Sequence, residues 1–266
     1  MKVKVGKRSF YMDGYLNSNI DIAVKMVHHD MDFVCIIDGL ERAGKSVLAL
    51  QLALYVDPSF NLSRVVFNSV DFKKAVTGAK KYQAVIYDEA MSGLASRTTM
   101  SYVNIMLVKA LAEIGQKNLF VFIVLPSFFE LDKYPAIHRS RCLLHVYMKG
   151  LRRGFFTFYD INKKRDLYLL GKKAYKYLVP ANFIGRFTNY YAVDEKEYRR
   201  LKHKSLTATR NTPAEMRMKT MRDSLINWCF KDLKKEKEAI IKGIRKYCEF
   251  SLHKRSIERI VQEKLK

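Results

Sequence analysis

The chain has 266 residues, 48% of them hydrophobic, and carries 49 Lys and Arg against 26 Asp and Glu, a formal net charge of +23. So much apolar material excludes a disordered chain and is enough to bury a sizeable core. The excess of positive charge predicts a polyanionic partner, nucleic acid first and an anionic membrane surface second; a generally basic proteome is the alternative explanation.

The cysteines and the apolar segments bear on the cellular compartment. Cys35, Cys142, Cys229 and Cys248 form no CxxC pair, so neither a zinc site nor a disulfide framework is indicated. The N-terminus lacks the apolar region of a signal peptide, and the longest apolar run, 119–129, is too short to span a bilayer. We therefore expect a soluble, cytoplasmic protein without a transmembrane segment, and peripheral membrane contact stays open.

Strand and helix patterns alternate along the first half of the chain. Compact apolar runs predict strands at 32–39, 64–69, 82–90, 119–127 and 142–148. Helical spacing of apolar residues predicts helices at 45–56, 70–81 and 101–118. This alternation predicts an α/β fold in which right-handed crossovers build a mainly parallel sheet covered on both faces.

The pattern changes after about residue 150. Residues 154–171 contain two aromatic-rich runs around a polar centre, which predicts a β-hairpin, and a tyrosine-rich segment then leads into a basic helix. The polar stretch 207–216 is the best linker, and the remainder is helical in pattern. We therefore expect a first domain over 1–206, extended by the hairpin from about 150, and a basic helical domain over 212–266.

A phosphate-binding motif follows the first strand of the alternating pattern. Residues 39–46, GLERAGKS, match G-x-x-x-x-G-K-[ST], between a predicted strand and a predicted helix as that motif requires. Backbone N–H groups of such a loop wrap the phosphates, Lys45 reaches the β- and γ-phosphates, and the Ser46 hydroxyl binds Mg²⁺. The residues expected to bind the nucleotide are Gly39, Leu40, Glu41, Arg42, Ala43, Gly44, Lys45, Ser46 and Val47.

Two carboxylates end the predicted strand at 82–90. Asp88 and Glu89 follow an apolar run, and ligands of open α/β sheets bind outside the carboxyl ends of the strands. Asp88 is expected to hold the magnesium shell, and Glu89 to activate or orient the attacking water. Because a phosphate-transferring kinase does not need the second acid, the pair favours ATP hydrolysis.

These two motifs together resemble the ATPase core of the additional-strand catalytic-glutamate branch of P-loop NTPases. In that branch an extra strand separates the strands that carry the two motifs. The order along this chain, the strand before the phosphate loop and then 64–69, 82–90 and 119–127, is in keeping with that branch. The chain is most similar to FtsK/HerA-type DNA-pumping ATPases, zonula-occludens-toxin-like phage ATPases and viral packaging motors. The resemblance implies a RecA-like core over about 30–150, ATP and Mg²⁺ as cofactors, and a homo-oligomeric ring on double-stranded DNA, with a capsid, portal or replication partner.

The chain departs from this family at two places. FtsK/HerA-type ATPases commonly end the fourth strand with Gln, whereas Ser127 is the only polar group there and is the candidate for sensing the γ-phosphate. Glu41 and Arg42 are unusual inside the phosphate loop, where Arg42 is the candidate to offset the charge of Glu41.

Arginines are the candidates for the positive charge that ring ATPases place on a neighbour's nucleotide. Arg139 and Arg141 precede the predicted fifth strand and Arg97 follows the acidic pair, so each is considered in trans or in cis. Solvated or phosphate-positioning roles are the alternative. Gln116 and Asn118 end the third predicted helix, where they either sense the nucleotide or cap the helix.

Two basic segments are the candidates for DNA contact. The predicted hairpin exposes Lys163, Lys164 and Arg165 at its tip, while its alternating aromatics either fill a core or stack on bases. Helices predicted at 239–248 and 253–265 resemble the end of a helix-turn-helix, or else form a basic hairpin packed on a partner. The residues that would face DNA there are His253, Lys254, Arg255, Ser256 and Arg259.

Four functions remain open from the sequence. An oligomeric Mg-ATP-dependent motor that moves or packages DNA, of viral, phage or plasmid type, agrees with all the motifs. A nucleotide-switched DNA-binding or replication-loading protein with a C-terminal helix-turn-helix is the alternative. A small-molecule kinase is disfavoured by Glu89, and a peripheral membrane assembly ATPase by the lack of a transmembrane segment.

Overall fold

The computed structural model describes residues 1–88, 97–113, 117–207, 221–226, 228–230 and 236–247. The chain divides into two compact units, Met1–Ala208 and Thr209–Lys266, and each is described by itself. Among the described helices, none is long and apolar enough to cross a membrane.

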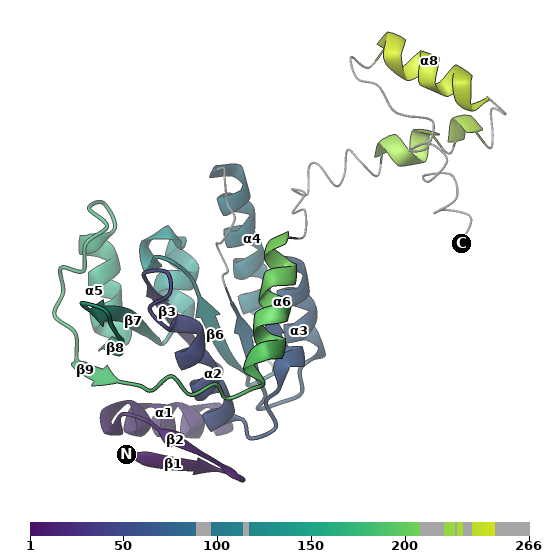
Figure 1. The fold of residues 1–266 in the computed structure, drawn as a ribbon. Helices are drawn as coiled ribbons and strands as arrows, with labels where there is room; N and C mark the ends of the chain where they lie inside the picture. Colours follow the sequence, from purple (N-terminus) through teal and green to yellow (C-terminus); the bar gives the residue numbers. More distant parts are fainter. Residues whose placement is uncertain (89–96, 114–116, 208–220, 227, 231–235, 248–266) are drawn as a thin grey trace. The chain divides into compact units, whose positions relative to one another are not determined.

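The first unit is built on a central sheet of mixed direction (Figure 1). Five neighbouring strands run parallel, and each of the last two pairs antiparallel with the strand before it. In spatial order the strands are β4 (Val65–Val66), β5 (Ala84–Tyr87), β6 (Phe120–Val124), β3 (Phe33–Gly39), β7 (Cys142–Lys149), β8 (Arg152–Tyr159) and β9 (Phe183–Arg186). Because β6 lies between β3 and β5, one strand separates the strand that leads into residues 39–46 from the strand that leads to Asp88.

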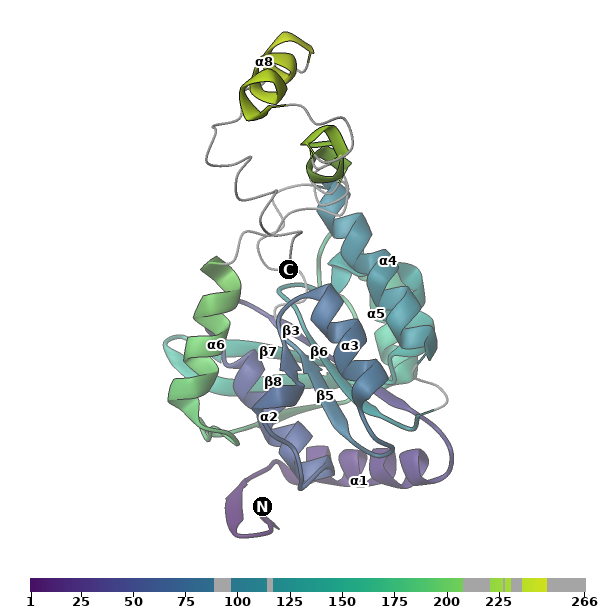
Figure 2. The same cartoon turned by 90° about the vertical axis from the view of Figure 1, so that its right-hand side faces the viewer.

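Helices cover both faces of this sheet, so its central strand is buried on both sides. Every residue of β3 is buried; Cys35 and Ile37 face one core, and Val34 and Ile36 face the other. Figure 2 shows α2 and α6 on one side of the sheet and α3, α4 and α5 on the other. The helices are α1 (Gly14–His28), α2 (Lys45–Val56), α3 (Ser69–Gly78), α4 (Arg97–Glu113), α5 (Ile161–Gly171) and α6 (Glu195–Thr207).

The helix after the phosphate loop begins and ends where the sequence predicts. Residues of α2 are buried on nearly all its sides, among them Leu48, Leu52 and Gln51, because the helix packs between the sheet and other elements of its face. The Gln51 amide donates to the carbonyls of Thr188 and Tyr190 at 2.7 and 2.9 Å. These bonds hold the segment before α6 against α2.

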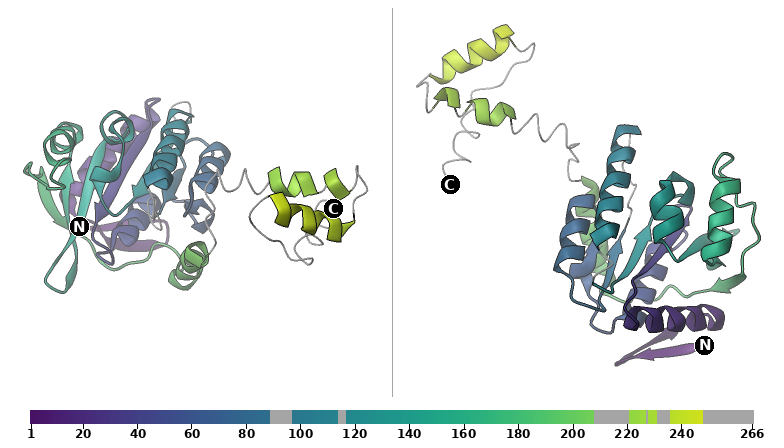
Figure 3. Two further views of the ribbon diagram at one scale, coloured as in Figure 1. Left: turned by 90° about the horizontal axis from the view of Figure 1, so that it is seen from above. Right: turned by 180° about the vertical axis from the view of Figure 1, so that it is seen from behind.

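A small N-terminal layer of two strands and a helix, none of them among the predicted elements, precedes the core. Strands β1 (Lys2–Val5) and β2 (Arg8–Tyr11) form a separate antiparallel pair, which Figure 3 shows beside α1. The Asp13 carboxylate caps α1 by accepting the N–H groups of Tyr15 and Leu16 at 3.0 and 3.2 Å. The ring of Phe10 stacks on Tyr190 at 5.2 Å, which ties this layer to the segment before α6.

The hairpin predicted at 154–171 is wrong in its second half. Its first run is strand β8, which pairs antiparallel with β7, but 161–171 is the helix α5. The Asp160 carboxylate caps this helix by accepting the N–H groups of Asn162 and Lys163 at 3.0 and 2.9 Å. The buried residues of α5 recur at helical spacing, and they are Lys164, Leu167, Tyr168 and Gly171.

The exposed basic tip expected at residues 163–165 is therefore absent, and Lys164 lies in the core. Its side chain is fully buried, and Nζ donates to the carbonyls of Ala136 and Ile137 at 2.5 and 3.3 Å and to Ser140 Oγ at 2.8 Å. These acceptors belong to the π-helix η4 (Tyr134–Arg139) and its cap. Lys164 thus stabilises the end of η4 and is not available to DNA; Lys163 and Arg165 lie on α5.

Burial of Lys164 predicts an unusual dependence of stability on pH. Burial lowers the pKa of Lys164 from its ordinary 10.5 to about 8. Between these values the unfolded chain holds the additional proton, so raising the pH through this window stabilises the fold. Relative to Lys164→Met, the free energy of unfolding of the wild type should rise by up to about 3 kcal/mol from about pH 8 to 10.5.

Urea unfolding of both proteins across this pH range measures the effect. The same substitution at the exposed Lys173 controls for the loss of one positive charge. A difference between wild type and Lys164→Met that stays constant from pH 8 to 10.5 would contradict the prediction.

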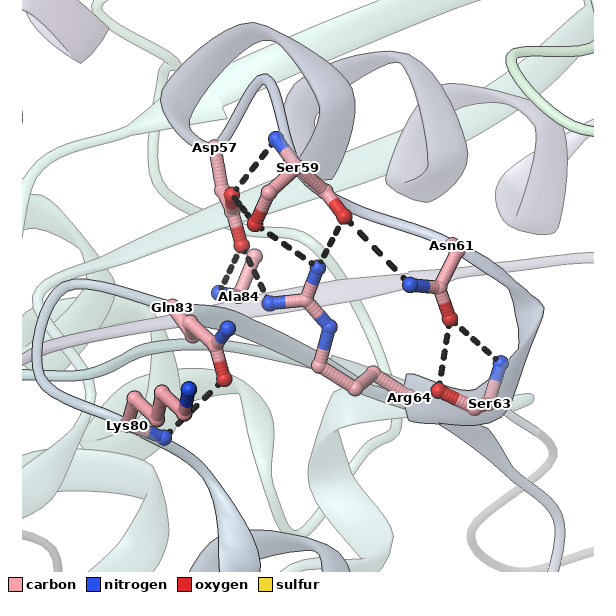
Figure 4. Close-up of polar contacts among 8 residues, drawn as sticks. All are labelled: Asp57, Ser59, Asn61, Ser63, Arg64, Lys80, Gln83 and Ala84. Carbon is pink, nitrogen blue, oxygen red and sulfur yellow. Dashed lines mark hydrogen bonds and ion pairs between the residues drawn. The ribbon is translucent and has the colours of Figure 1, made fainter.

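A buried ion pair ties the end of α2 to the starts of β4 and β5 (Figure 4). Arg64 Nη1 donates to Asp57 Oδ2 at 2.5 Å, and Nη2 donates to the Ser59 carbonyl at 2.5 Å. The same carboxylate accepts the Ala84 N–H at 2.9 Å. The side chains of Arg64 and Asp57 are only 10% and 6% exposed, so the charges depend on each other.

Removing the arginine should therefore be costly. We expect Arg64→Met to lower the free energy of unfolding by about 3–5 kcal/mol, because it leaves the buried Asp57 without its cation. Urea denaturation measures the loss. Lys74→Met is the matched control: its ion pair with Asp71 is exposed, and its loss should change stability by less than about 1 kcal/mol. Equal effects of the two substitutions would contradict this reasoning.

The second unit is described only in part. Helix α8 (Lys237–Tyr247) overlaps the helix predicted at 239–248. Ile226 and Ile240 are the buried residues of one small hydrophobic cluster, and Cys229, Phe230 and Ile241 pack against it. The helix predicted at 253–265, with His253, Lys254, Arg255, Ser256 and Arg259, lies outside the described residues.

Candidate active site

The backbone of the phosphate loop requires glycine at both ends. Gly39 has φ +129°, and a Cβ there would lie 1.9 Å from the carbonyl oxygen of Val146 on β7. Gly44 has φ +107°, and its Cβ would lie 3.0 Å from the ring of Phe187. L-residues rarely adopt such φ values, so the loop takes this course because glycine stands at both places.

The unusual interior of the loop lies at its surface. Glu41 and Arg42 are exposed, whereas Ala43 is fully buried. Arg42 has φ +61°, a left-handed conformation that it shares with the glycine two residues on. Left-handed residues of this kind help to turn successive N–H groups toward one anion. The loop can therefore carry the two charged side chains because both are exposed to solvent. The small side chain lies at the one buried position of the three, Ala43.

Lys45 begins α2 and folds back over the loop. Its Nζ donates to the carbonyls of Gly39 and Leu40 at 2.6 and 2.8 Å. Burial lowers the pKa of Lys45, and the Asp38 carboxylate is the strongest of the charges that oppose this shift. Because its two bonds are to backbone carbonyls, the ammonium can exchange them for phosphate oxygens.

Ser46 and Asp88 meet although 42 residues separate them in sequence. Asp88 follows β5, where its N–H donates to the Val66 carbonyl at 2.8 Å. Its carboxylate is fully buried, and Oδ1 accepts the Ser46 hydroxyl at 3.0 Å. The parallel arrangement of β3 and β5 thus brings the two predicted metal ligands together.

Helix α6 adds a cation and a phenol to this pair. Lys202 Nζ lies 3.5 Å from Asp88 Oδ2 and 3.4 Å from Ser46 Oγ, and the Tyr198 hydroxyl donates to Asp88 Oδ2. The ammonium thus lies where the Asp88 carboxylate and the Ser46 hydroxyl together attract a cation. Since Mg²⁺ prefers hard oxygen ligands, this donor set fits the metal.

A second buried carboxylate supports the loop from the other face of the sheet. Asp38 immediately precedes Gly39 and is fully buried. It accepts the Phe128 N–H at 2.7 Å, contacts His145 Nδ1 at 3.0 Å and accepts the Tyr177 hydroxyl. Burial and the charge of Asp38 raise the pKa of Tyr177. These bonds connect the base of the loop to β7 and to the residues that follow β6.

The loop opens into a cavity of about 1160 Å³. This exceeds the usual volume of a small-molecule pocket, so there is room for a nucleoside triphosphate. Its walls come from the phosphate loop, the end of β6, the β7–β8 hairpin, the segment before α6 and α6 itself. They include Glu41, Lys45, Ser46, Asp88, Pro126, Leu151, Arg153, Phe187, Asn189, Tyr191, Tyr198, Arg199 and Lys202.

Several predicted site residues do not line this cavity or lie outside the described residues. Glu89 and Gln116 lie outside the described residues, and so does the side chain of Arg97, the first residue of α4. Ser127 caps the short helix η3 (Phe128–Glu130), with its hydroxyl accepting the Phe129 N–H at 3.4 Å. Ser127 therefore acts as the N-cap of η3, beside the cavity.

Arg139, Arg141 and Asn118 lie at the amino ends of the parallel strands, whereas the loop lies at their carboxyl ends. Arg139 and Arg141 precede β7 and Asn118 precedes β6, and both strands run parallel to β3, which ends at the loop. Arg139 forms an ion pair with Asp32 and donates to the Leu111 carbonyl at 2.6 Å. Neither arginine thus lies at the loop of its own chain, nor does Asn118, and action of the arginines in trans stays a prediction.

Among the described residues, three cations line the cavity besides the predicted Arg42 and Lys45, and the sequence did not indicate them as site residues. Arg153 belongs to β8, and Arg199 and Lys202 belong to α6. Tyr198 and Lys202 are four residues apart, a spacing that places them on one helix face. Nothing local in the sequence indicates that this face is directed at the phosphate loop. The position of α6 depends on the segment 187–194, which runs along α2 and leads into α6.

The chain resembles solved structures of two kinds, while no family model and no curated protein matches it. One is the DNA-packaging ATPase B204 of Sulfolobus turreted icosahedral virus, at 12% identity and TM-score 0.36, covering 51% of this chain and 95% of that one. B204 of Sulfolobus turreted icosahedral virus 2, in complex with AMP, matches over the same shares at 12% identity and TM-score 0.34.

The other kind is the N-terminal domain of zonular occludens toxin from Neisseria meningitidis. It is 16% identical with TM-score 0.34, and the match covers 64% of this chain and 98% of that one. Both kinds are among those that the sequence motifs resemble. The assignment of the core as a P-loop NTPase fold rests on the strand order and the loop described above.

Proposed function

We propose that the protein is an Mg-ATP-dependent ATPase that acts on DNA. The observation that carries the proposal is the contact of Ser46 with the buried Asp88 at 3.0 Å, at the mouth of a glycine-bounded phosphate loop. A hydroxyl and a carboxylate at this place are suited to hold the cation of a nucleotide.

Each residue of the site then has a defined task. The loop N–H groups and the start of α2 bind the phosphates, and Lys45 neutralises the charge that grows on the transferred phosphoryl group. Bound Mg²⁺ supplies electrostatic stabilisation of the phosphate oxygens, and Ser46 and Asp88 are the residues to hold it. Glu89, next to Asp88, orients and deprotonates the attacking water.

The energy is proposed to move or package double-stranded DNA. A net charge of +23 favours a polyanionic partner, because phosphate neutralisation releases counterions. The function proposed is an oligomeric motor, a homo-oligomeric ring with a capsid, portal or replication partner. One of Arg97, Arg139 and Arg141 would act on the nucleotide of the neighbouring subunit.

Phosphate release with and without double-stranded DNA, together with the mass of the protein under ATP, tests this proposal. Stimulation by DNA of any sequence and a mass several times that of the 31.1 kDa chain would support the motor. A monomer whose hydrolysis is indifferent to DNA would contradict it.

A nucleotide-switched DNA-binding protein is the second candidate. The observation that favours it is that Thr209–Lys266 forms a compact unit of its own, separate from the unit that carries the phosphate loop. Here His253, Lys254, Arg255 and Arg259 would contact DNA. Binding of the full chain to one sequence over others, changed by ATP, would favour this candidate over the motor.

A further inference from the structure

Helix α6 places a tethered cation on the two proposed metal ligands. We propose that Lys202 is a residue of the nucleotide site that competes with Mg²⁺ for Asp88 and Ser46, and that Mg-nucleotide binding therefore releases α6 from the site. This inference rests on the proposed function, since it concerns the regulation of the same site.

The contacts of Lys202 match those expected of a competitor. Its Nζ lies 3.5 Å from Asp88 Oδ2 and 3.4 Å from Ser46 Oγ, so it contacts both proposed ligands at once. Its side chain is 25% exposed, whereas that of Asp88 is 1% exposed. The ammonium therefore approaches a buried carboxylate from the open side, which is the side of the cavity.

Electrostatics favours one cation at this place. A buried carboxylate is costly unless a positive charge compensates it, and Lys202 provides that charge. Mg²⁺ binds oxygen at about 2.0–2.1 Å, so a metal on these two ligands would lie within a few ångströms of the ammonium. The repulsion at that distance is strong even in partly hydrated surroundings. Lys202 must then leave Asp88.

The departure of Lys202 has a direction. Lys202 lines the cavity, and its charge already lowers the pKa of Lys45, so both ammonium groups face the space proposed for the triphosphate. Lys202 can exchange Asp88 for a phosphate oxygen. Tyr198, one turn earlier on α6, donates to the same oxygen of Asp88 and loosens with it. The nucleotide thereby changes the position of the last helix of this unit, which ends at Thr207.

Nucleotide affinity with and without the metal tests the inference without using turnover. The dissociation constant of ADP is measured by calorimetry in excess Mg²⁺ and in EDTA, for the wild type and for Lys202→Met. Without Lys202, Asp88 repels metal-free ADP and binds the metal without competition. The ratio of the two constants, EDTA over Mg²⁺, should therefore rise by about tenfold or more.

A control variant separates competition from a general effect of charge. Lys196→Met removes the same charge from an exposed position of α6. It should keep the wild-type ratio. Lys202→Gln, which retains a polar side chain, replaces Lys202→Met if the latter does not fold.

An unchanged ratio in the Lys202 variant overturns the inference, as does an equal rise in Lys196→Met. If instead the wild type binds no ADP under either condition, the proposed function fails, so the two failures can be told apart.

Discussion

Lys45→Ala abolishes ATP hydrolysis: we expect turnover to fall by about 10²- to 10³-fold or more. The ammonium at the start of α2 is the charge proposed to bind the phosphates, and its present acceptors, the carbonyls of Gly39 and Leu40, lie in the loop itself. Phosphate release at saturating ATP measures the loss, and calorimetry shows the accompanying fall in nucleotide affinity.

Lys45 is half-buried, and its Nζ donates to the backbone carbonyls of Gly39 and Leu40 in the loop, so its replacement should leave the fold intact. The exposed Lys196→Ala is the control for charge and should hydrolyse ATP like the wild type. Turnover in Lys45→Ala within a few-fold of the wild type would show that the loop does not bind the triphosphate as proposed.

Glu89→Gln should separate nucleotide binding from hydrolysis. The amide cannot accept the proton of the attacking water, so turnover should fall by about 10²- to 10⁴-fold. Nucleotide affinity should stay near that of the wild type, because Lys45, Ser46 and Asp88 remain. Single-turnover hydrolysis and calorimetry measure the two effects.

The matched control is Glu236→Gln, an exposed glutamate in the second unit. It should change neither quantity. Glu89→Gln with turnover like that of the wild type would exclude water activation by this carboxylate, and a loss of nucleotide binding would place Glu89 among the binding groups.

The phosphate loop and the central sheet could be predicted because their signals are local. Gly39 and Gly44 stand where the backbone has positive φ values. The apolar runs of β3, β5 and β6 are buried on both faces of the sheet. The strand predicted at 64–69 shrinks to Val65–Val66, because Asn68 caps α3 by accepting the Asp71 N–H at 2.8 Å. A short polar cap there overrides β propensity.

The errors arise where tertiary contacts decide. Aromatic and aliphatic residues of 166–170 suggest a strand, but the cap at Asp160 and the burial of Lys164 and Tyr168 on one face favour helix α5. Similarly, Lys202 is one of many lysines in a basic segment. Only the packing of α6 beside Asp88 gives it a place in the site, and no sequence spacing encodes that packing.

The close approach of Gly39 to β7 has a consequence for how this protein can vary over evolution. Because a Cβ at position 39 would lie 1.9 Å from the Val146 carbonyl, a backbone atom that every residue type carries, no exchange at position 146 can compensate for a side chain at 39. The exposed Glu41 and Arg42 meet no such constraint. Related chains should therefore keep glycine at 39 while they diversify the two charged residues beside it.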